Sequence, residues 1–209
     1  MDLKEMYQGV VHGNAQVVSR DVQKALQSGI APSTLLFDCL IPAMSDVGKR
    51  FERNEFFVPE MLIAARAMNA GMALLKPLLA ESGVKPVGKV ALGTVKGDLH
   101  DIGKNLVGMM MEGAGFEVID LGVDVPPEAF VRAAREGADI IALSALLTTT
   151  MPSMQVTVDA LTEAGLRARV KVLVGGAPVT EAYAAQIGAD GYAPDASTAA
   201  RKARELLSG

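Results

Sequence analysis

Short apolar runs that alternate with helix-length segments are the feature that most constrains the fold of this chain. Five such runs predict strands at 89–95, 116–121, 140–144, 171–174 and, more weakly, 191–193. The segments between and after them predict helices near 103–114, 126–137, 153–165, 180–187 and 196–207. Strands that are apolar on both faces need helices on both sides. The pattern therefore predicts an α/β domain with a doubly wound, five-stranded parallel sheet, flavodoxin-like (Rossmann-like) in its strand order.

The N-terminal part of the chain follows a different pattern. Apolar residues recur there at helical spacing and predict helices near 4–12, 14–28, 32–52 and 58–80. Pro42 and Pro77 fall inside two of these helices and predict kinks or frayed turns. This part is therefore expected to form a helical bundle.

Gly, Pro and polar residues at 81–88 interrupt both patterns and indicate a linker. The sequence thus predicts two domains, a helical bundle over residues 1–84 and the α/β domain over residues 85–209.

Composition excludes several classes of protein. The net charge of -4 and the dispersed basic residues argue against nucleic acid as a partner. A single cysteine, Cys39, excludes an internal disulfide or a thiolate cluster and fits a reducing cytoplasm. The polar opening is unlike a secretion signal. No apolar run is expected to reach the roughly 18 residues that span a bilayer, so no membrane association is expected.

A histidine stands at the carboxyl end of the first predicted strand, where sheets of this kind present ligands. The segment reads Gly97-Asp98-Leu99-His100-Asp101-Ile102-Gly103. Imidazole is a common metal ligand whose second nitrogen is usually held by a carboxylate, which Asp98 or Asp101 could supply. The alternative is a solvated loop histidine beside a helix-capping aspartate.

Two later loops are expected at the same edge of the sheet. One carries Leu146 together with Ser144, Thr148 and Thr150, and the hydroxyls of the last three could bind a buried polar ligand. The other carries Gly175 and Gly176, which permit close approach to the backbone. Taken singly, the hydroxyls could equally cap a helix and the glycines could form an ordinary turn.

These motifs resemble those of the cobalamin-binding domains of methionine synthase and of methyltransferase corrinoid proteins. The family signature D-x-H-x-x-G, S-x-L and G-G corresponds to Asp98-x-His100-x-x-Gly103, Ser144-x-Leu146 and Gly175-Gly176. The resemblance extends to the N-terminal part through 57–68, so it covers nearly the whole chain.

The resemblance implies a role for each matched residue. His100 matches the ligand to cobalt, Asp98 matches the carboxylate that holds its second nitrogen, and Thr150 replaces the serine that completes this relay. Gly103 matches a glycine beside the cofactor's nucleotide tail, Ser144 and Thr148 match its pocket, and Gly175 and Gly176 match the border of the benzimidazole. The further cofactor-binding residues expected are Gly97, Asp101, Ile102 and Leu146.

The function implied is that of a corrinoid methyl carrier, either non-catalytic alone or the corrinoid subunit of a methyltransferase system, with cobalamin or a related corrinoid as cofactor. Its implied partners are a substrate-specific methyltransferase, a corrinoid:acceptor methyltransferase for a thiol or tetrahydrofolate, and a reductive activation protein. The bundle would be a cap over the cofactor. The methyl donor, the acceptor and the oligomeric state are left open. The alternatives are a cobalamin-dependent regulatory sensor, a mutase-type domain, and a flavodoxin-like protein without a corrin.

Overall fold

The computed structural model describes residues 3–208, and the chain divides into two compact units. One unit holds the chain up to Pro86 together with Gly113–Gly115, and the other holds Val87–Glu112 and the chain from Phe116 onward. We call them the helical unit and the sheet unit.

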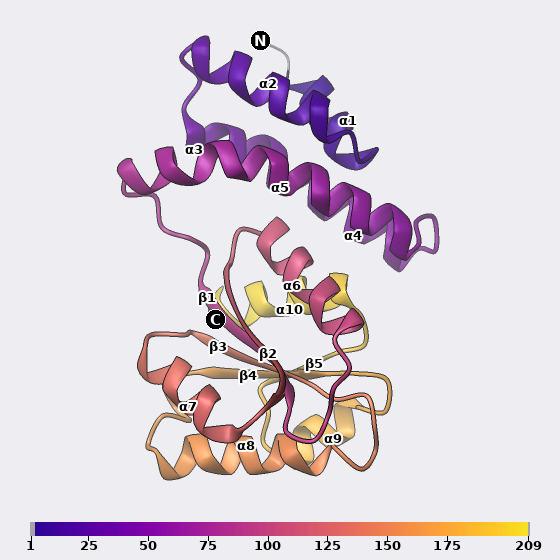
Figure 1. Cartoon of the computed structure of the whole chain (residues 1–209), viewed down its shortest axis with the longest axis vertical. Coiled ribbons are helices and arrows are strands. Elements are labelled where there is room, and N and C mark those ends of the chain that lie inside the picture. The colour runs from indigo at the N-terminus through magenta and orange to yellow at the C-terminus, as the bar shows by residue number, and fades with distance from the viewer. Residues whose placement is uncertain (1–2, 209) are drawn as a thin grey trace. The chain divides into compact units, whose positions relative to one another are not determined.

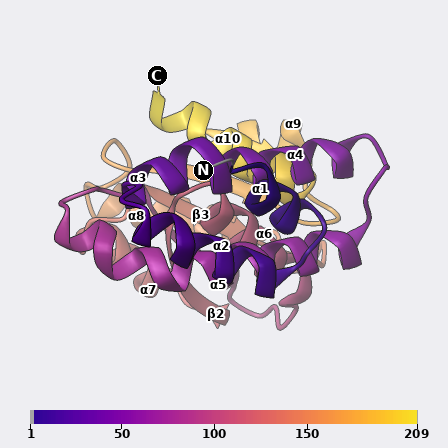
Figure 2. The ribbon, with the colours of Figure 1, turned by 90° about the horizontal axis from the view of Figure 1, so that it is seen from above.

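The helical unit is a bundle, as its apolar spacing predicts. Its elements are α1 (Lys4–Val11), α2 (Ala15–Gln27), α3 (Pro32–Leu35), the π-helical turn η1 (Leu36–Leu40), α4 (Ile41–Glu52) and α5 (Val58–Glu81). α2 and α5 lie side by side (Figure 1, Figure 2). Met44, Met61 and Met68 are fully buried, where their flexible side chains fill the core of the unit.

The two internal prolines have different consequences. Pro42 has no N–H, and the turn before it is widened so that the N–H of Ile41 donates to the carbonyl of Leu36, five residues back. The helix expected over 32–52 is therefore divided into α3, η1 and α4. At Pro77 the helix is not divided, since α5 continues to Glu81.

α5 also departs from one expectation. By length and mean hydropathy alone it could cross a membrane, which the sequence analysis excluded for every segment. Its apolar residues include Met61, Ala64, Met68 and Leu75, all fully buried against the rest of the chain. A core helix of a bundle meets the same test of length and hydropathy.

The sheet unit confirms the predicted architecture. Five parallel strands are ordered β2-β1-β3-β4-β5. Helices α7, α8 and α9 cover one face, and α6 and α10 cover the other (Figure 1). The strands are β1 (Lys89–Val95), β2 (Glu117–Val125), β3 (Ile140–Ser144), β4 (Lys171–Gly175) and β5 (Gly191–Ala193). The helices are α6 (Ile102–Gly113), α7 (Pro127–Arg135), α8 (Pro152–Glu163), α9 (Glu181–Gln186) and α10 (Ala196–Ser208).

The central strands are buried on both faces, as their apolar composition requires. On one face, Ala91, Ile141 and Val172 pack against Phe130 of α7 in a continuous core. Gly93 makes room for this phenylalanine, because a Cβ at residue 93 would lie 2.8 Å from the ring.

Two aspartates hold the amino ends of the strands through paired backbone contacts. The N–H of Asp139 donates to the carbonyl of Lys89, and its carboxylate accepts from the N–H of Lys89, both at 2.8 Å. Asp190 makes the same pair of contacts with Val172, at 2.8 and 2.6 Å. We call this arrangement a two-way aspartate contact. It sets the start of β1 and of β4 relative to their neighbours.

β1 lies between β2 and β3, so the chain winds in opposite directions on its two sides. The crevice beyond the carboxyl ends of such strands is where doubly wound sheets bind ligands. β2 is longer than the expected 116–121 and reaches Val125. Its pairing with β1 is irregular beyond Leu92, where Gly122 has a positive φ of 88°.

Candidate functional site

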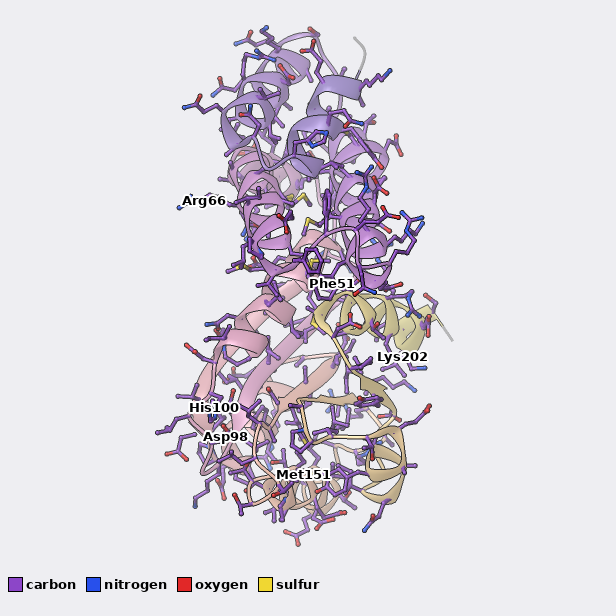
Figure 3. The ribbon with its side chains drawn as sticks, turned by 90° about the vertical axis from the view of Figure 1, so that its right-hand side faces the viewer. Phe51, Arg66, Asp98, His100, Met151 and Lys202 are labelled. Carbon is purple, nitrogen blue, oxygen red and sulfur yellow. The ribbon has the colours of Figure 1, made fainter. Side chains whose placement is uncertain are left out.

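His100 and Asp98 form the centre of the site, on the loop of residues 96–101 that connects β1 to α6. We call this segment the His100 loop; Figure 3 shows the two side chains next to each other. Nδ1 of His100 donates to Oδ1 of Asp98 at 3.0 Å, and the backbone N–H of His100 donates to the same oxygen at 3.1 Å. Asp98 is fully buried, whereas the imidazole is 53% exposed. With Nδ1 engaged, Nε2 is the nitrogen left to bind a metal.

The second oxygen of Asp98 is held from the loop of residues 145–151, which follows β3. Oδ2 accepts from the N–H of Leu146 at 2.8 Å and from the hydroxyl of Thr150 at 2.7 Å. Burial on its own would raise the pKa of Asp98, but the hydrogen bonds from Leu146, Thr150 and His100 outweigh it and lower the pKa far below its ordinary value. Asp98 is therefore an ionised carboxylate that orients the imidazole.

Thr150 is itself held in place. Its hydroxyl lies 2.9 Å from the carbonyl of Leu147 and 2.7 Å from Asp98, so its one hydrogen has two acceptors. The hydroxyl of Tyr183 in α9 donates to the carbonyl of the next residue, Met151, at 2.7 Å. The position of Thr150 thus depends on packing between two helices of the sheet unit.

The backbone of the His100 loop is held by two residues that sequence reasoning missed. The buried hydroxyl of Thr94 donates to the carbonyl of His100 at 2.7 Å. The carboxylate of Asp124 accepts from the N–H of Gly97 at 2.7 Å, and the N–H of Asp124 donates to the carbonyl of Asp98 at 2.9 Å. A hydroxyl inside the apolar run of β1 was a usable signal for Thr94. Asp124 was missed because the second strand was predicted to end at residue 121, before this residue.

Four further predicted residues lie on the His100 loop or at the start of α6. Gly97 has a positive φ of 86°. The carboxylate of Asp101 accepts from the side chain of Asn105 at 3.3 Å, so Asp98 and not Asp101 supplies the partner of His100. Ile102 is 81% exposed. A Cβ added to Gly103 would meet no atom within 4 Å, which leaves open space beside the start of α6.

The remaining predicted residues lie at the ends of β3 and β4. Ser144 pairs with Thr94 on one side and with Gly175 on the other. Leu146 donates its N–H to Asp98. Thr148 is exposed on the 145–151 loop.

Gly175 and Gly176 have a structural reason that the sequence analysis did not give them. A Cβ on Gly175 would lie 2.8 Å from the carbonyl oxygen of Ala193, and a Cβ on Gly176 would collide with the carbonyl of Ala145. Gly176 also has a positive φ of 131°. Close packing of the backbone therefore requires both glycines, independently of any ligand.

The donor set suits a metal that brings most of its own ligands. In residues 3–208 no cluster of three or more His, Cys, Asp or Glu side chains could hold a metal ion, so His100 would act as a single protein ligand. Apolar side chains of the His100 loop and of the 145–151 loop are unusually exposed, with Leu99 at 73% and Leu147 at 44%. A half-exposed, carboxylate-held imidazole, an apolar rim and the open space at Gly103 fit a large planar metallocofactor such as a corrin.

Two family models match the chain. Both are described as B12 binding domains, one over residues 88–201 and the other over residues 2–76. The first covers the whole sheet of the sheet unit, and the second lies within the helical unit.

Relatives match over nearly the full length. The dimethylamine corrinoid protein 1 of Methanosarcina acetivorans is 46% identical, with 98% of this chain and 97% of the relative covered. A cobalamin-binding protein from Desulfitobacterium hafniense has a solved structure that superposes with a TM-score of 0.83 at 35% identity, covering 99% and 98% of the two chains. The methanol:cobalamin methyltransferase complex of Methanosarcina barkeri matches with a TM-score of 0.85 at 30% identity, covering 98% of this chain and 79% of that one. The chain therefore belongs to the B12-binding corrinoid proteins of methyltransferase systems.

Proposed function

We propose that this chain is a methyl-carrying corrinoid protein in which Nε2 of His100 is the protein's ligand to cobalt. One observation carries the proposal: Nδ1 of His100 donates to a buried carboxylate, while the imidazole is half exposed. This arrangement places the lone pair of the imidazole on Nε2. When bound, the corrinoid supplies a cobalt that takes up and releases a methyl group.

The residues around His100 set its protonation. An ionised Asp98 stabilises the tautomer with a proton on Nδ1, and it raises the basicity of Nε2. A proton taken up by the His100–Asp98 pair can rest on Asp98, whose Oδ2 would then donate to the hydroxyl of Thr150. Thr150 can accept this hydrogen bond because its own hydrogen can turn to the carbonyl of Leu147. We therefore propose Asp98, Thr150 and His100 as the residues that link cobalt ligation to proton uptake.

The other predicted residues complete the proposed cofactor site. Ile102 and Leu146 would offer apolar contact, and the open space at Gly103 would admit the nucleotide tail. We assign Gly97 and Asp101 to the turn that presents the histidine. Ser144 and Thr148 remain proposed pocket residues, and Gly175 and Gly176 would border the pocket with their backbone.

Corrinoid proteins of this family work with methyltransferases. Several relatives are named dimethylamine corrinoid proteins, so we propose that a methylamine methyltransferase donates to this chain. A second methyltransferase would remove the methyl group. A reductive activation protein would return oxidised cobalt to cobalt(I). We expect these reactions in the cytoplasm and without nucleic acid or membrane.

We further propose that the predicted bundle domain, residues 1–84, is the cap for the reactive face of the cofactor. Apolar side chains at the start of α5 are unusually exposed for a bundle, with Phe57 at 61% and Ile63 at 46%. Exposed apolar side chains suit contact with an apolar ligand or partner.

An absorption spectrum tests the proposal. The native chain and His100→Ala are mixed with hydroxocobalamin, desalted and compared. We expect stoichiometric retention by the native chain, with the cofactor's own base displaced and histidine bound, and loss of the histidine-bound spectrum in the variant. If the native chain retains no corrinoid, the proposed function is wrong. If retention and spectrum are the same in both proteins, His100 is not the ligand.

A further inference from the structure

Asp124 is in an unusual backbone conformation at the site. It lies next to the last residue of β2 and has a φ of 51°, in the left-handed region that residues with a side chain rarely adopt. Among residues 3–208 only Asn54 shares this property outside the glycines. Such a conformation costs free energy and persists where surrounding contacts stabilise it.

Two hydrogen bonds connect Asp124 to the His100 loop. Its carboxylate accepts from the N–H of Gly97 at 2.7 Å, and its N–H donates to the carbonyl of Asp98 at 2.9 Å. As in the contacts of Asp139 and Asp190, the aspartate both donates its N–H and accepts with its carboxylate, but here the two partners are different residues and the contact lies at the opposite end of the sheet. At the amino ends the contact sets strand pairing. Here it holds the backbone on both sides of the Gly97–Asp98 peptide bond.

The His100 loop is therefore held from both neighbouring strands. From the β3 side, Leu146 and Thr150 hold the carboxylate of Asp98. From the β2 side, Asp124 holds the backbone that carries that carboxylate. The irregular β1–β2 pairing beyond Leu92 brings Asp124 to this position: the register shifts before Gly93, which pairs with Gly122, and again before Val95, which pairs with Val125.

We infer that Asp124 is a positioning residue for the cobalt ligand: it acts through the His100 loop to keep Oδ1 of Asp98 on Nδ1 of His100. This inference rests on the proposed function of His100. Asp124 need not touch the cofactor. Without the hydrogen bond from Gly97 to the carboxylate of Asp124, the backbone at Gly97 is free to rotate. The carboxylate of Asp98 then has more than one position relative to Nδ1 of His100.

Three substitutions separate the hydrogen bond from the backbone conformation. Asp124→Asn keeps an acceptor oxygen and tolerates positive φ. Asp124→Gly tolerates positive φ but removes the acceptor. Asp124→Ala loses both. The matched control is Asp139→Ala, which likewise removes only the carboxylate half of such a contact, at the amino end of the sheet.

The first readout is the ratio of histidine-bound to histidine-free corrinoid, measured by absorption on the loaded protein. The second needs no cofactor: the ¹⁵N shifts of the imidazole of His100 report its tautomer at a fixed alkaline pH. The chain has two histidines, so His12 in α1's C-terminal turn serves as internal reference.

We expect Asp124→Asn to match the native protein in both readouts. Asp124→Gly and Asp124→Ala should lower the bound-to-free ratio by roughly fivefold, the effect of one lost hydrogen bond, and shift His100 away from the Nδ1–H tautomer. Asp139→Ala should lower the unfolding temperature and leave both readouts unchanged.

Two results would overturn the inference. One is a native ratio and tautomer in Asp124→Gly and Asp124→Ala; the other is an equal change in Asp139→Ala, which would mean that general loosening of the sheet is the cause. If Asp124→Ala does not fold, Asp124→Gly decides. If the native chain retains no corrinoid, the proposed function fails, and the tautomer measurement still decides whether Asp124 positions His100.

Discussion

The hydroxyl of Thr150 lies 2.7 Å from Oδ2 of Asp98, although the two residues are 52 positions apart in the chain. On the other side of the same carboxylate, Oδ1 receives both the ring and the backbone N–H of His100. Each oxygen of Asp98 thus has two donors, and the carboxylate connects the loops that follow β1 and β3.

Removing the hydroxyl of Thr150 should weaken this connection. Thr150→Val leaves Oδ2 of Asp98 with the N–H of Leu146, and the free energy of unfolding should fall by roughly 1–3 kcal/mol, because the lost hydrogen bond reaches a charged group. Thr150→Ser retains the hydroxyl and should lose less. Urea unfolding at neutral pH measures both. A loss in Thr150→Ser as large as that in Thr150→Val would contradict this expectation, and a larger one would show that the methyl group matters more than the hydroxyl.

Replacing Asp98 by Asn should change the tautomer of His100. An amide offers one acceptor side, and the N–H of Leu146 and the hydroxyl of Thr150 occupy it. The NH₂ then faces Nδ1 of His100, which must accept, and the ring proton moves to Nε2. We expect a folded but less stable protein in which ¹⁵N shifts place the proton on Nε2 and the corrinoid loses its histidine. An unchanged tautomer would contradict this account.

Acid should remove the contribution of Asp98 to stability. The pKa of Asp98 is lowered in the folded chain. Its stabilising effect is therefore present above the ordinary pKa of about 3.9 and is lost as pH falls below that value toward the lowered pKa. The difference in free energy of unfolding between the native chain and Asp98→Asn should shrink as pH falls below about 4. Urea titrations at several pH values test this; a difference that grows in acid would mean that the carboxylate is not stabilised by folding.

The glycines of the site should separate into two classes. Gly103→Leu should fold normally, since its Cβ meets open space, and should lose corrinoid retention. Gly176→Ala should lower stability by several kcal/mol, because its Cβ meets the carbonyl of Ala145 and its φ is positive. Thermal unfolding and corrinoid retention are measured on both. A stable Gly176→Ala or an unstable Gly103→Leu would contradict this division.

Local patterns predicted most elements of the sheet unit. β1, β3 and β5 occupy the predicted ranges. β2 was predicted to end at Leu121 because Gly122 and Asp124 break its apolar run. The register shift lets the strand pair again at Val125, and no residue pattern within β2 shows this.

The site was predictable where one short motif carries it. Asp98, His100 and Gly103 lie within six residues, so their proximity follows from the sequence. The contacts of Thr94, Asp124 and Tyr183 come from other elements, and they depend on strand order and on the path of β2. The motif of residues 98–103 contains none of these three residues, so it could not predict their hydrogen bonds.

The contacts of Asp139 and Asp190 have a consequence for how this sheet can diverge. They set strand register at the amino ends, whereas every residue of the proposed site lies at the carboxyl ends or beyond. Register and ligand recognition are thus encoded by separate stretches of the chain. Loops at the carboxyl edge can be exchanged for those of a related protein, and such a chimera should still find its strand register while acquiring a different specificity.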